Sequence, residues 1–350
     1  MTRREGGLDS RVWLLWGLAA SLPPLIGRNP LPLAATLLAV AGVRAAWANS
    51  RPNAASWGSL LRLAAVFSLF GVLFNVLTVP VGDTVIAEVP ERVPLVGSSL
   101  TLNALVYGLL GGLALLTLVA IGTTLGAVLD WPEVLRLLPR RLSGVATAGS
   151  VAFAFIPQTV MAFHEIREAQ AARGYRPRGV RGFVPIIVPL LAGGMDRALT
   201  LAEALESRAF GSTPGTTDRS STWRRFALAL GLTAGATGGY LLATSNVTVA
   251  IACLGGSLAL IWLGSRDPSG RTFTRTRYRD PQWRRTDTVV TGLTCLALLT
   301  IVGSMARNSA GLRYEPYPSL DPPTVDLLLL MGIGLLVAPA FCAPPGRERP

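Results

Sequence analysis

The sequence predicts an all-α membrane protein, a polytopic helical bundle with a platform of coupling helices on its cytoplasmic side. Half of its 350 residues are of hydrophobic type and the mean hydropathy is +0.46, so the chain is too apolar for a soluble globule and long enough for several membrane spans. The chain has 32 arginines and no lysine, and these arginines lie in short stretches between apolar runs. Membrane topology explains that distribution better than a nucleic-acid partner does.

The apolar runs predict eight spans. They cover residues 12–27, 31–47, 60–79, 101–129, 226–242, 247–263, 289–305 and 325–341. Hydropathy alone would also count 142–163 as a span, but a crossing there would separate the arginine-rich stretch 164–225 from Arg136, Arg140 and Arg141.

We therefore expect residues 130–224 to stay cytoplasmic. With the N-terminus also inside, 28 of the 32 arginines are cytoplasmic, as the positive-inside rule requires. All eight tryptophans then fall at cytoplasmic ends of spans, where we expect them to anchor in the lipid interface. This topology describes a multi-pass protein of the cell membrane.

Several classes of chemistry are disfavoured. Without lysine the chain cannot form the usual phosphate-binding loop for ATP. His164 is the single histidine, and Cys253, Cys295 and Cys342 have no metal-ligand spacing. We expect no catalytic residue, metal site or cofactor in this chain, and hence no enzyme.

One eight-residue pattern occurs twice, 35 positions apart. Residues 168–175 read EAQAARGY and residues 203–210 read EALESRAF, so both fit Glu-Ala-x-x-(Ala/Ser)-Arg-(Gly/Ala)-aromatic. Each copy ends a helical pattern that follows a proline-bounded apolar run. Arg173 and Arg208 therefore lie at the C-terminal ends of two predicted helices.

These arginines admit two interpretations. Each could be a capping charge that complements the negative end of its helix dipole. Alternatively, the small residues that flank each arginine leave its guanidinium unobstructed for a groove on a partner. The repetition favours the second interpretation.

The repeated Ala-Arg-Gly motif and its Ser-Arg-Ala variant resemble those of the transmembrane T component of energy-coupling factor (ECF) importers, which are ABC transporters for vitamins and transition metals. The two-span opening joined by Arg28-Asn29-Pro30 is also similar, and the resemblance covers about residues 10–243. It implies that two cytoplasmic ATPase subunits dock on the arginines and that the platform holds a separate substrate-binding S component. The chain itself would couple ATP-driven movement to transport.

The resemblance also implies roles for individual residues. The docking residues would be Ala172, Arg173, Gly174, Ser207, Arg208 and Ala209. The coupling helices that carry them would be supported by Glu168, Gln170, Glu203 and Glu206. The second motif departs from the family pattern, because Ala209 places a methyl group where glycine allows the closest backbone approach.

The predicted organisation has four parts. Residues 1–129 form a four-span bundle, 130–224 the coupling helices, 225–243 a fifth span, and 244–350 an extension with about three further spans. The resemblance does not reach the extension, which we expect either to pack beside the core or to form an additional binding surface.

Two other functions remain open on the sequence alone. A conventional ABC permease is the closer one, although the apolar runs lack the buried charges expected of a substrate path. The other is a membrane enzyme or sensor in which Arg173, Arg176, Arg178 and Arg181 bind an anionic lipid or a phosphorylated substrate.

Overall fold

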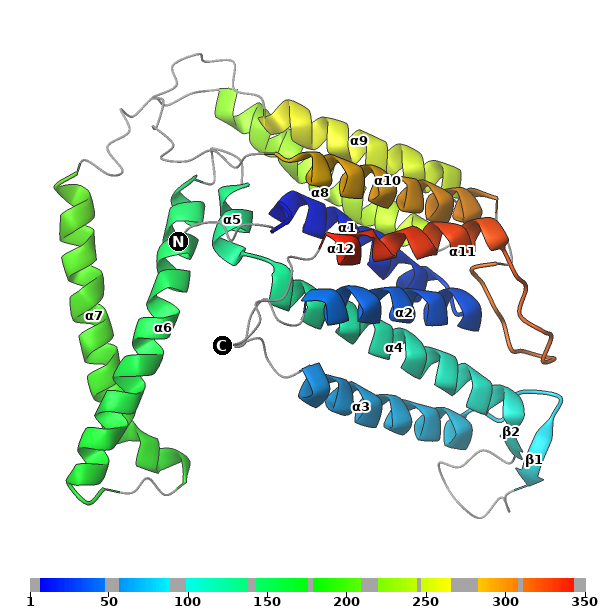
Figure 1. Ribbon diagram of the computed structural model, residues 1–350, viewed down its shortest axis with the longest axis horizontal. Coiled ribbons are helices and arrows are strands. Elements are labelled where there is room, and N and C mark those ends of the chain that lie inside the picture. The colour runs from blue at the N-terminus through cyan, green and yellow to red at the C-terminus, as the bar shows by residue number, and fades with distance from the viewer. Residues whose placement is uncertain are drawn as a thin grey trace. The chain divides into compact units, whose positions relative to one another are not determined.

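The protein folds into helices that form two compact units (Figure 1). The computed structural model describes residues 7–47, 57–88, 99–137, 143–175, 179–208, 220–243, 247–265, 283–307 and 311–342. One unit consists of residues 1–129 together with 224–350, and the other consists of residues 130–223. The all-α prediction is confirmed, since the described β-structure is a single two-stranded hairpin.

The first unit contains most of the elements. They are α1 (Ser10–Ile26), α2 (Pro30–Trp47), α3 (Trp57–Thr78), β1 (Val85–Glu88), β2 (Ser99–Thr101), α4 (Leu102–Val128), α8 (Ser220–Ala243), α9 (Val247–Ser265), α10 (Arg285–Ala306), α11 (Leu327–Gly334), the 3₁₀ helix η4 (Leu335–Val337) and α12 (Ala338–Phe341). Three helices begin at N-cap side chains that accept a backbone N–H, those of Asp9, Thr101 and Asp326. Short polar residues before apolar runs therefore define where these helices start.

Helices α3 and α4 pack closely because α4 presents glycines to α3. A Cβ at Gly108 would lie 2.9 Å from the Cα of Val72, and the Ser68 hydroxyl donates a hydrogen bond of 3.0 Å to the Gly112 carbonyl. Small residues and a serine at a helix contact are typical of membrane bundles. The opposite side of α3 exposes large apolar side chains such as Phe70, as expected for contact with lipid.

The C-terminal helices pack into the bundle. Helix α10 lies against α1, and α11, η4 and α12 lie against α2. Residues 283–342 thus belong to the same compact unit as α1–α4. The helical hairpin α8–α9 is held by another glycine contact, in which the Ser257 hydroxyl donates to the Gly231 carbonyl at 2.6 Å.

The tryptophans of α1 and α2 differ from the prediction. Trp13, Trp16 and Trp47 are not anchors at the lipid interface but are buried within the bundle, where their rings meet edge to face. Trp131 and Trp283 are exposed, as an interfacial position requires. The position of a tryptophan near a helix end indicates depth in the membrane but not the direction of the side chain.

Among the described residues, six helices are long and apolar enough to cross a membrane: α2, α3, α4, α10 and two helices of the second unit, α6 (Ser143–Ala172) and α7 (Val184–Glu206). The chain is therefore a multi-pass membrane protein. The length and composition of α6 and α7 fit a helix that crosses the membrane and equally fit an apolar helix that lies at the membrane surface. The cytoplasmic position of these two helices stays a prediction from the arginine distribution.

Candidate docking site

The second unit is built from two long helices and two short elements. The short α5 (Trp131–Arg136) packs on the start of α6, where the ring of Trp131 stacks on that of Phe153 at 6.4 Å. The 3₁₀ helix η3 (Val180–Phe183) leads into α7, which packs on α6. Ile186 near the start of α7 is fully buried. These contacts make the two long helices a crossed pair (Figure 1).

The first repeated motif forms a Schellman cap at the end of α6. The Gly174 N–H donates to the Ala171 carbonyl at 2.9 Å, and the Tyr175 N–H donates to the Gln170 carbonyl at 2.9 Å. Gly174 adopts φ +79°, which side chains with a Cβ rarely adopt. The predicted helix end is thus observed one residue before Arg173.

The second motif ends α7 in a different way. The Ser207 N–H donates to the Glu203 carbonyl at 2.9 Å, and the Ser207 hydroxyl donates to the Ala204 carbonyl at 3.0 Å. Arg208 follows in a turn, and its N–H donates to the Leu205 carbonyl at 3.2 Å. Ala209, the counterpart of Gly174, lies outside the described residues.

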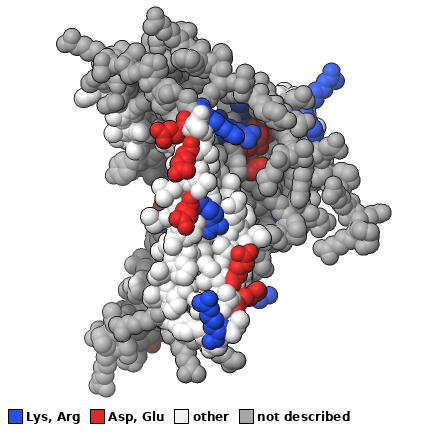
Figure 2. Space-filling view, turned by 90° about the vertical axis from the view of Figure 1, so that its left-hand side faces the viewer, with Lys and Arg blue, Asp and Glu red and all other residues white. Residues whose placement is uncertain are grey.

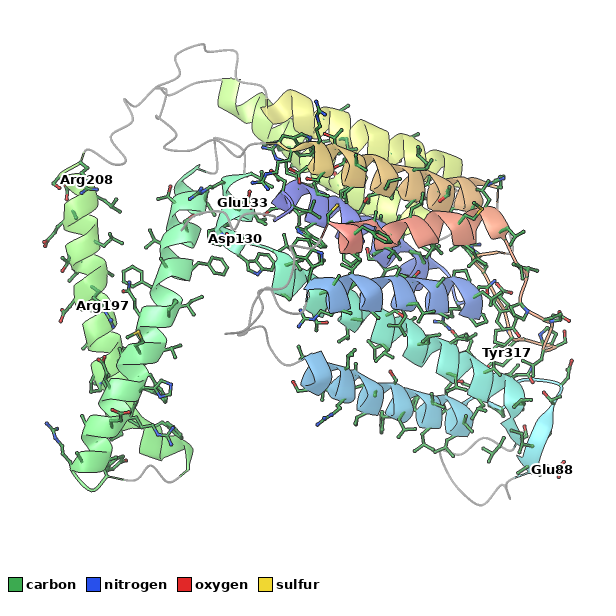
Figure 3. All side chains as sticks on the ribbon, viewed as in Figure 1. Glu88, Asp130, Glu133, Arg197, Arg208 and Tyr317 are labelled. Atoms are coloured by element: carbon green, nitrogen blue, oxygen red, sulfur yellow. The ribbon has the colours of Figure 1, made fainter. Side chains whose placement is uncertain are left out.

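Both arginine side chains are exposed. Within the described part of the chain, neither the Arg173 nor the Arg208 guanidinium has a hydrogen-bond or ion-pair partner. By contrast, the Arg197 guanidinium in the middle of α7 donates its Nε–H to the Gly193 carbonyl at 2.9 Å (Figure 3). The two motif arginines are therefore available for a partner.

The two arginines lie at opposite ends of the crossed pair. A short connector joins the end of α6 to the start of α7, so Arg173 is near the end of the pair at which α7 begins. Arg208 is at the far end of α7 (Figure 3). With 23 residues, α7 is about 34 Å long. This length separates the two tips of the pair, which are the ends of α6 and α7 that carry Arg173 and Arg208.

The polar residues of the repeat lie in the last turns of their helices. Glu168, Glu203 and Glu206 are exposed, whereas Gln170 is half-buried. The Gln170 and Glu203 backbone carbonyls accept the bonds that close the two helix ends. In both copies the repeat thus supplies a capped end and exposed acidic groups beside an exposed arginine.

Large apolar side chains cover much of the remaining surface of the pair. The exposed ones include Val145, Ile156, Val160 and Met161 on α6, and Val184, Val188, Leu191, Met195 and Leu199 on α7. Figure 2 shows broad areas of this face without charged side chains, between separate groups of acidic and basic residues. Such a surface is typical of a binding face for protein or membrane.

Sequence reasoning missed one residue of this site. The Tyr175 hydroxyl donates to the Gly182 carbonyl at 3.1 Å and closes the connector between α6 and η3. The aromatic position of the repeat was the signal for this contact, but the repeat pattern shows neither the partner nor the loop that it closes. Of the proposed anion site, Arg176 and Arg178 lie outside the described residues.

Comparison with protein-family models places most of the described membrane helices of the first half of the chain in a known family. The family model for CbiQ, described as cobalt transport protein, matches residues 7–218. This range starts just before α1, contains both arginine motifs and ends just before α8. No curated protein matches the chain. Because the match covers more than half of its 350 residues, the chain belongs to the CbiQ cobalt transport protein family.

Proposed function

We propose that this membrane protein of a transport family is the energy-coupling T component of an ECF-type importer. Two ATPase subunits dock on its arginine tips, and a separate substrate-binding S component rests on its apolar platform. The chain itself carries out no chemistry and binds no nucleotide. The family description names cobalt, which supports a transition metal as the cargo ahead of a vitamin.

The separation of the two tips carries this proposal. A capping role requires each arginine only to lie at the end of its own helix, whereas docking of two subunits also requires the arginines to be far apart and free. Arg173 and Arg208 are exposed and separated by the length of α7. The planar guanidinium forms paired hydrogen bonds with a carboxylate, so acidic grooves on the ATPases are suitable partners.

Helices α6 and α7 transmit the movement in this mechanism. ATP binding and hydrolysis bring the two ATPases together and apart, which displaces the two tips. Packed helices move as units, so a displacement of the tips changes how the pair crosses at the contact around Ile186. The exposed apolar side chains then move with their helices and tilt the S component that covers them.

The test is a pull-down of the ATPases together with an uptake assay. Arg173→Glu and Arg208→Glu should each strongly reduce ATPase recovery, and the double variant should abolish it. Arg136→Glu is the matched control, because Arg136 is an exposed arginine in the last turn of α5 but lies outside the repeat. All variants should reach the membrane in normal amount.

A double variant that still recovers the ATPases normally would contradict the proposal. It would reduce Arg173 and Arg208 to capping charges. Equal losses in Arg136→Glu and in the two motif variants would show that general surface charge, not the repeated motif, holds the ATPases.

A further inference from the structure

Residues 283–342 lie beyond the family match and yet form part of the packed interior. Helices α1 and α2 contact α4 as well as α10, α11, η4 and α12. Val12, Trp13, Leu33, Val40 and Val43 of α1 and α2 are fully buried in this arrangement. The C-terminal helices thus complete the core of the family-matched helices.

Two indoles from the family-matched part bind the backbone of the C-terminal helices. The Trp16 Nε1–H donates to the Leu336 carbonyl at 2.8 Å, and the Trp47 Nε1–H donates to the Pro339 carbonyl at 2.9 Å. Both carbonyls lie where α11 gives way to η4 and α12, so regular helical bonding is interrupted there. Backbone carbonyls within a membrane need internal donors. The Trp16 indole supplies one to Leu336, and the Trp47 indole adds a second donor to the Pro339 carbonyl, which also accepts the Cys342 N–H at 3.2 Å.

The turn between α1 and α2 holds the segment that connects α10 to α11. The Asn29 side-chain amide donates to the Gly311 carbonyl at 2.9 Å and to the Thr324 carbonyl at 3.0 Å. Gly27 lies directly against the Leu312 carbonyl, which leaves no room for a Cβ. A single buried asparagine therefore fixes both ends of this connecting segment.

The start of α4 holds the middle of the same segment. The Asn103 side-chain amide donates to the Pro316 carbonyl at 2.6 Å and to the Pro318 carbonyl at 2.9 Å. Between these two prolines, Tyr317 places its ring 5.5 Å from that of Tyr107 (Figure 3). Each of these donors belongs to the family-matched residues, and each acceptor belongs to the C-terminal segment.

We propose that residues 283–342 act as a built-in subunit, which recognises the α1–α2 face through these contacts and remains bound without its covalent link. The donors and the buried apolar side chains of α1, α2 and α4 form the receiving surface. Because its own C-terminal segment occupies this face, a separate membrane subunit has to bind elsewhere on the protein. This inference is independent of the proposed ATPase docking.

The full-length protein provides the test. A protease recognition sequence is inserted after Ser269, and the folded protein is cut in mild detergent and captured by an N-terminal tag. We expect most of the C-terminal fragment to stay bound through gel filtration. The double variant Trp16→Phe, Trp47→Phe should retain severalfold less of it, because phenylalanine keeps an aromatic ring but has no N–H to donate.

Trp131→Phe is the matched control, since Trp131 lies in the other compact unit, and it should retain as much fragment as the unsubstituted protein. Release of the fragment from the unsubstituted protein would overturn the proposal, because the covalent link alone would then hold the segment. Equal retention by the double variant would overturn the role of the two indoles. Even if the double variant fails to fold, cutting the unsubstituted protein shows whether the C-terminal fragment stays bound without its covalent link.

Discussion

The variant Gly174→Ala tests whether the end of α6 is a docking site or an ordinary helix end. Gly174 has φ +79°, and a Cβ added there would meet no atom within 4 Å, so the substitution introduces backbone strain without a steric clash. Holding a non-glycine residue in the left-handed region costs about 1–2 kcal/mol. If the bound ATPase requires this cap, that cost lowers its affinity by a factor of about 5–30.

The matched control is Gly194→Ala. Gly194 lies inside α7, and a Cβ added there also meets no atom within 4 Å. Its backbone is helical, so alanine should stabilise α7 by roughly 0.5–1 kcal/mol and leave ATPase binding unchanged. The assay is a titration of purified ATPase subunits against this protein in detergent or nanodiscs, with thermal unfolding measured in parallel.

The ATPase affinities and unfolding temperatures of Gly174→Ala and Gly194→Ala together show whether the Schellman cap positions Arg173. If Gly174→Ala binds the ATPases as tightly as Gly194→Ala does, the Schellman cap does not position Arg173 for a partner. If Gly174→Ala loses affinity while its unfolding temperature stays near normal, the strain acts at the docked tip. If both the ATPase affinity and the unfolding temperature of Gly174→Ala fall, the cap stabilises α6 itself.

Three further outcomes are expected. Arg208→Lys should give an intermediate loss of ATPase recovery. Lysine could replace a capping charge worth only about 0.3–1 kcal/mol with little effect, whereas it would substitute poorly in a buried charge pair, which costs roughly 2–5 kcal/mol to break. Unchanged recovery would favour the capping role. Cysteines placed at Ser143 and Ser212 in a background without native cysteines should both resist an impermeant thiol reagent in intact cells, and labelling of Ser212 alone would mean that α6 crosses the membrane. Gly27→Ala should lower the unfolding temperature in detergent, because its Cβ would strike a backbone carbonyl, whereas Gly42→Ala, with no atom within 4 Å of its Cβ, should not.

The positions of most helices could be predicted because apolar runs and capping residues are local signals. The apolar run 12–27 is observed as the helix Ser10–Ile26, where Asp9 caps the first turn, and the run 31–47 is observed as the helix Pro30–Trp47. Such signals depend only on neighbours in the sequence. Pairing between distant helices leaves no comparable trace in a single sequence.

The place of the C-terminal helices shows this limit. Packing beside the core was one of two expectations for the extension, yet Leu336 and Pro339 accept bonds from tryptophans some 300 positions earlier. Nothing in the periodicity of either segment indicates such a contact. The burial of Trp16 and Trp47 could not be predicted for the same reason, because a tryptophan at a helix end is compatible with lipid neighbours and with protein neighbours.

The candidate site was more accessible to sequence reasoning because its main features are local. The helix ends at Arg173 and Arg208 follow from the repeat and from Gly174, which is suited to a left-handed cap. The separation of the tips required the structure, since the repeat does not show that α7 turns back along α6. The bond from Tyr175 to Gly182 likewise depends on how the connector folds.

The two motifs differ in the residue that follows each arginine, which is Gly174 in the first and Ala209 in the second. At the first tip, the left-handed Gly174 and the Tyr175 hydroxyl bond fix the chain on the C-terminal side of Arg173. At the second, Ala209 occupies the equivalent position, and alanine would need about 1–2 kcal/mol to adopt the same left-handed backbone. Preorganised groups lose less entropy when they bind, so Arg173 should dock at a smaller cost than Arg208 does. If two ATPases dock as proposed, we therefore expect Arg208→Glu to reduce ATPase recovery less than Arg173→Glu does, and equal losses would contradict this difference between the two motifs.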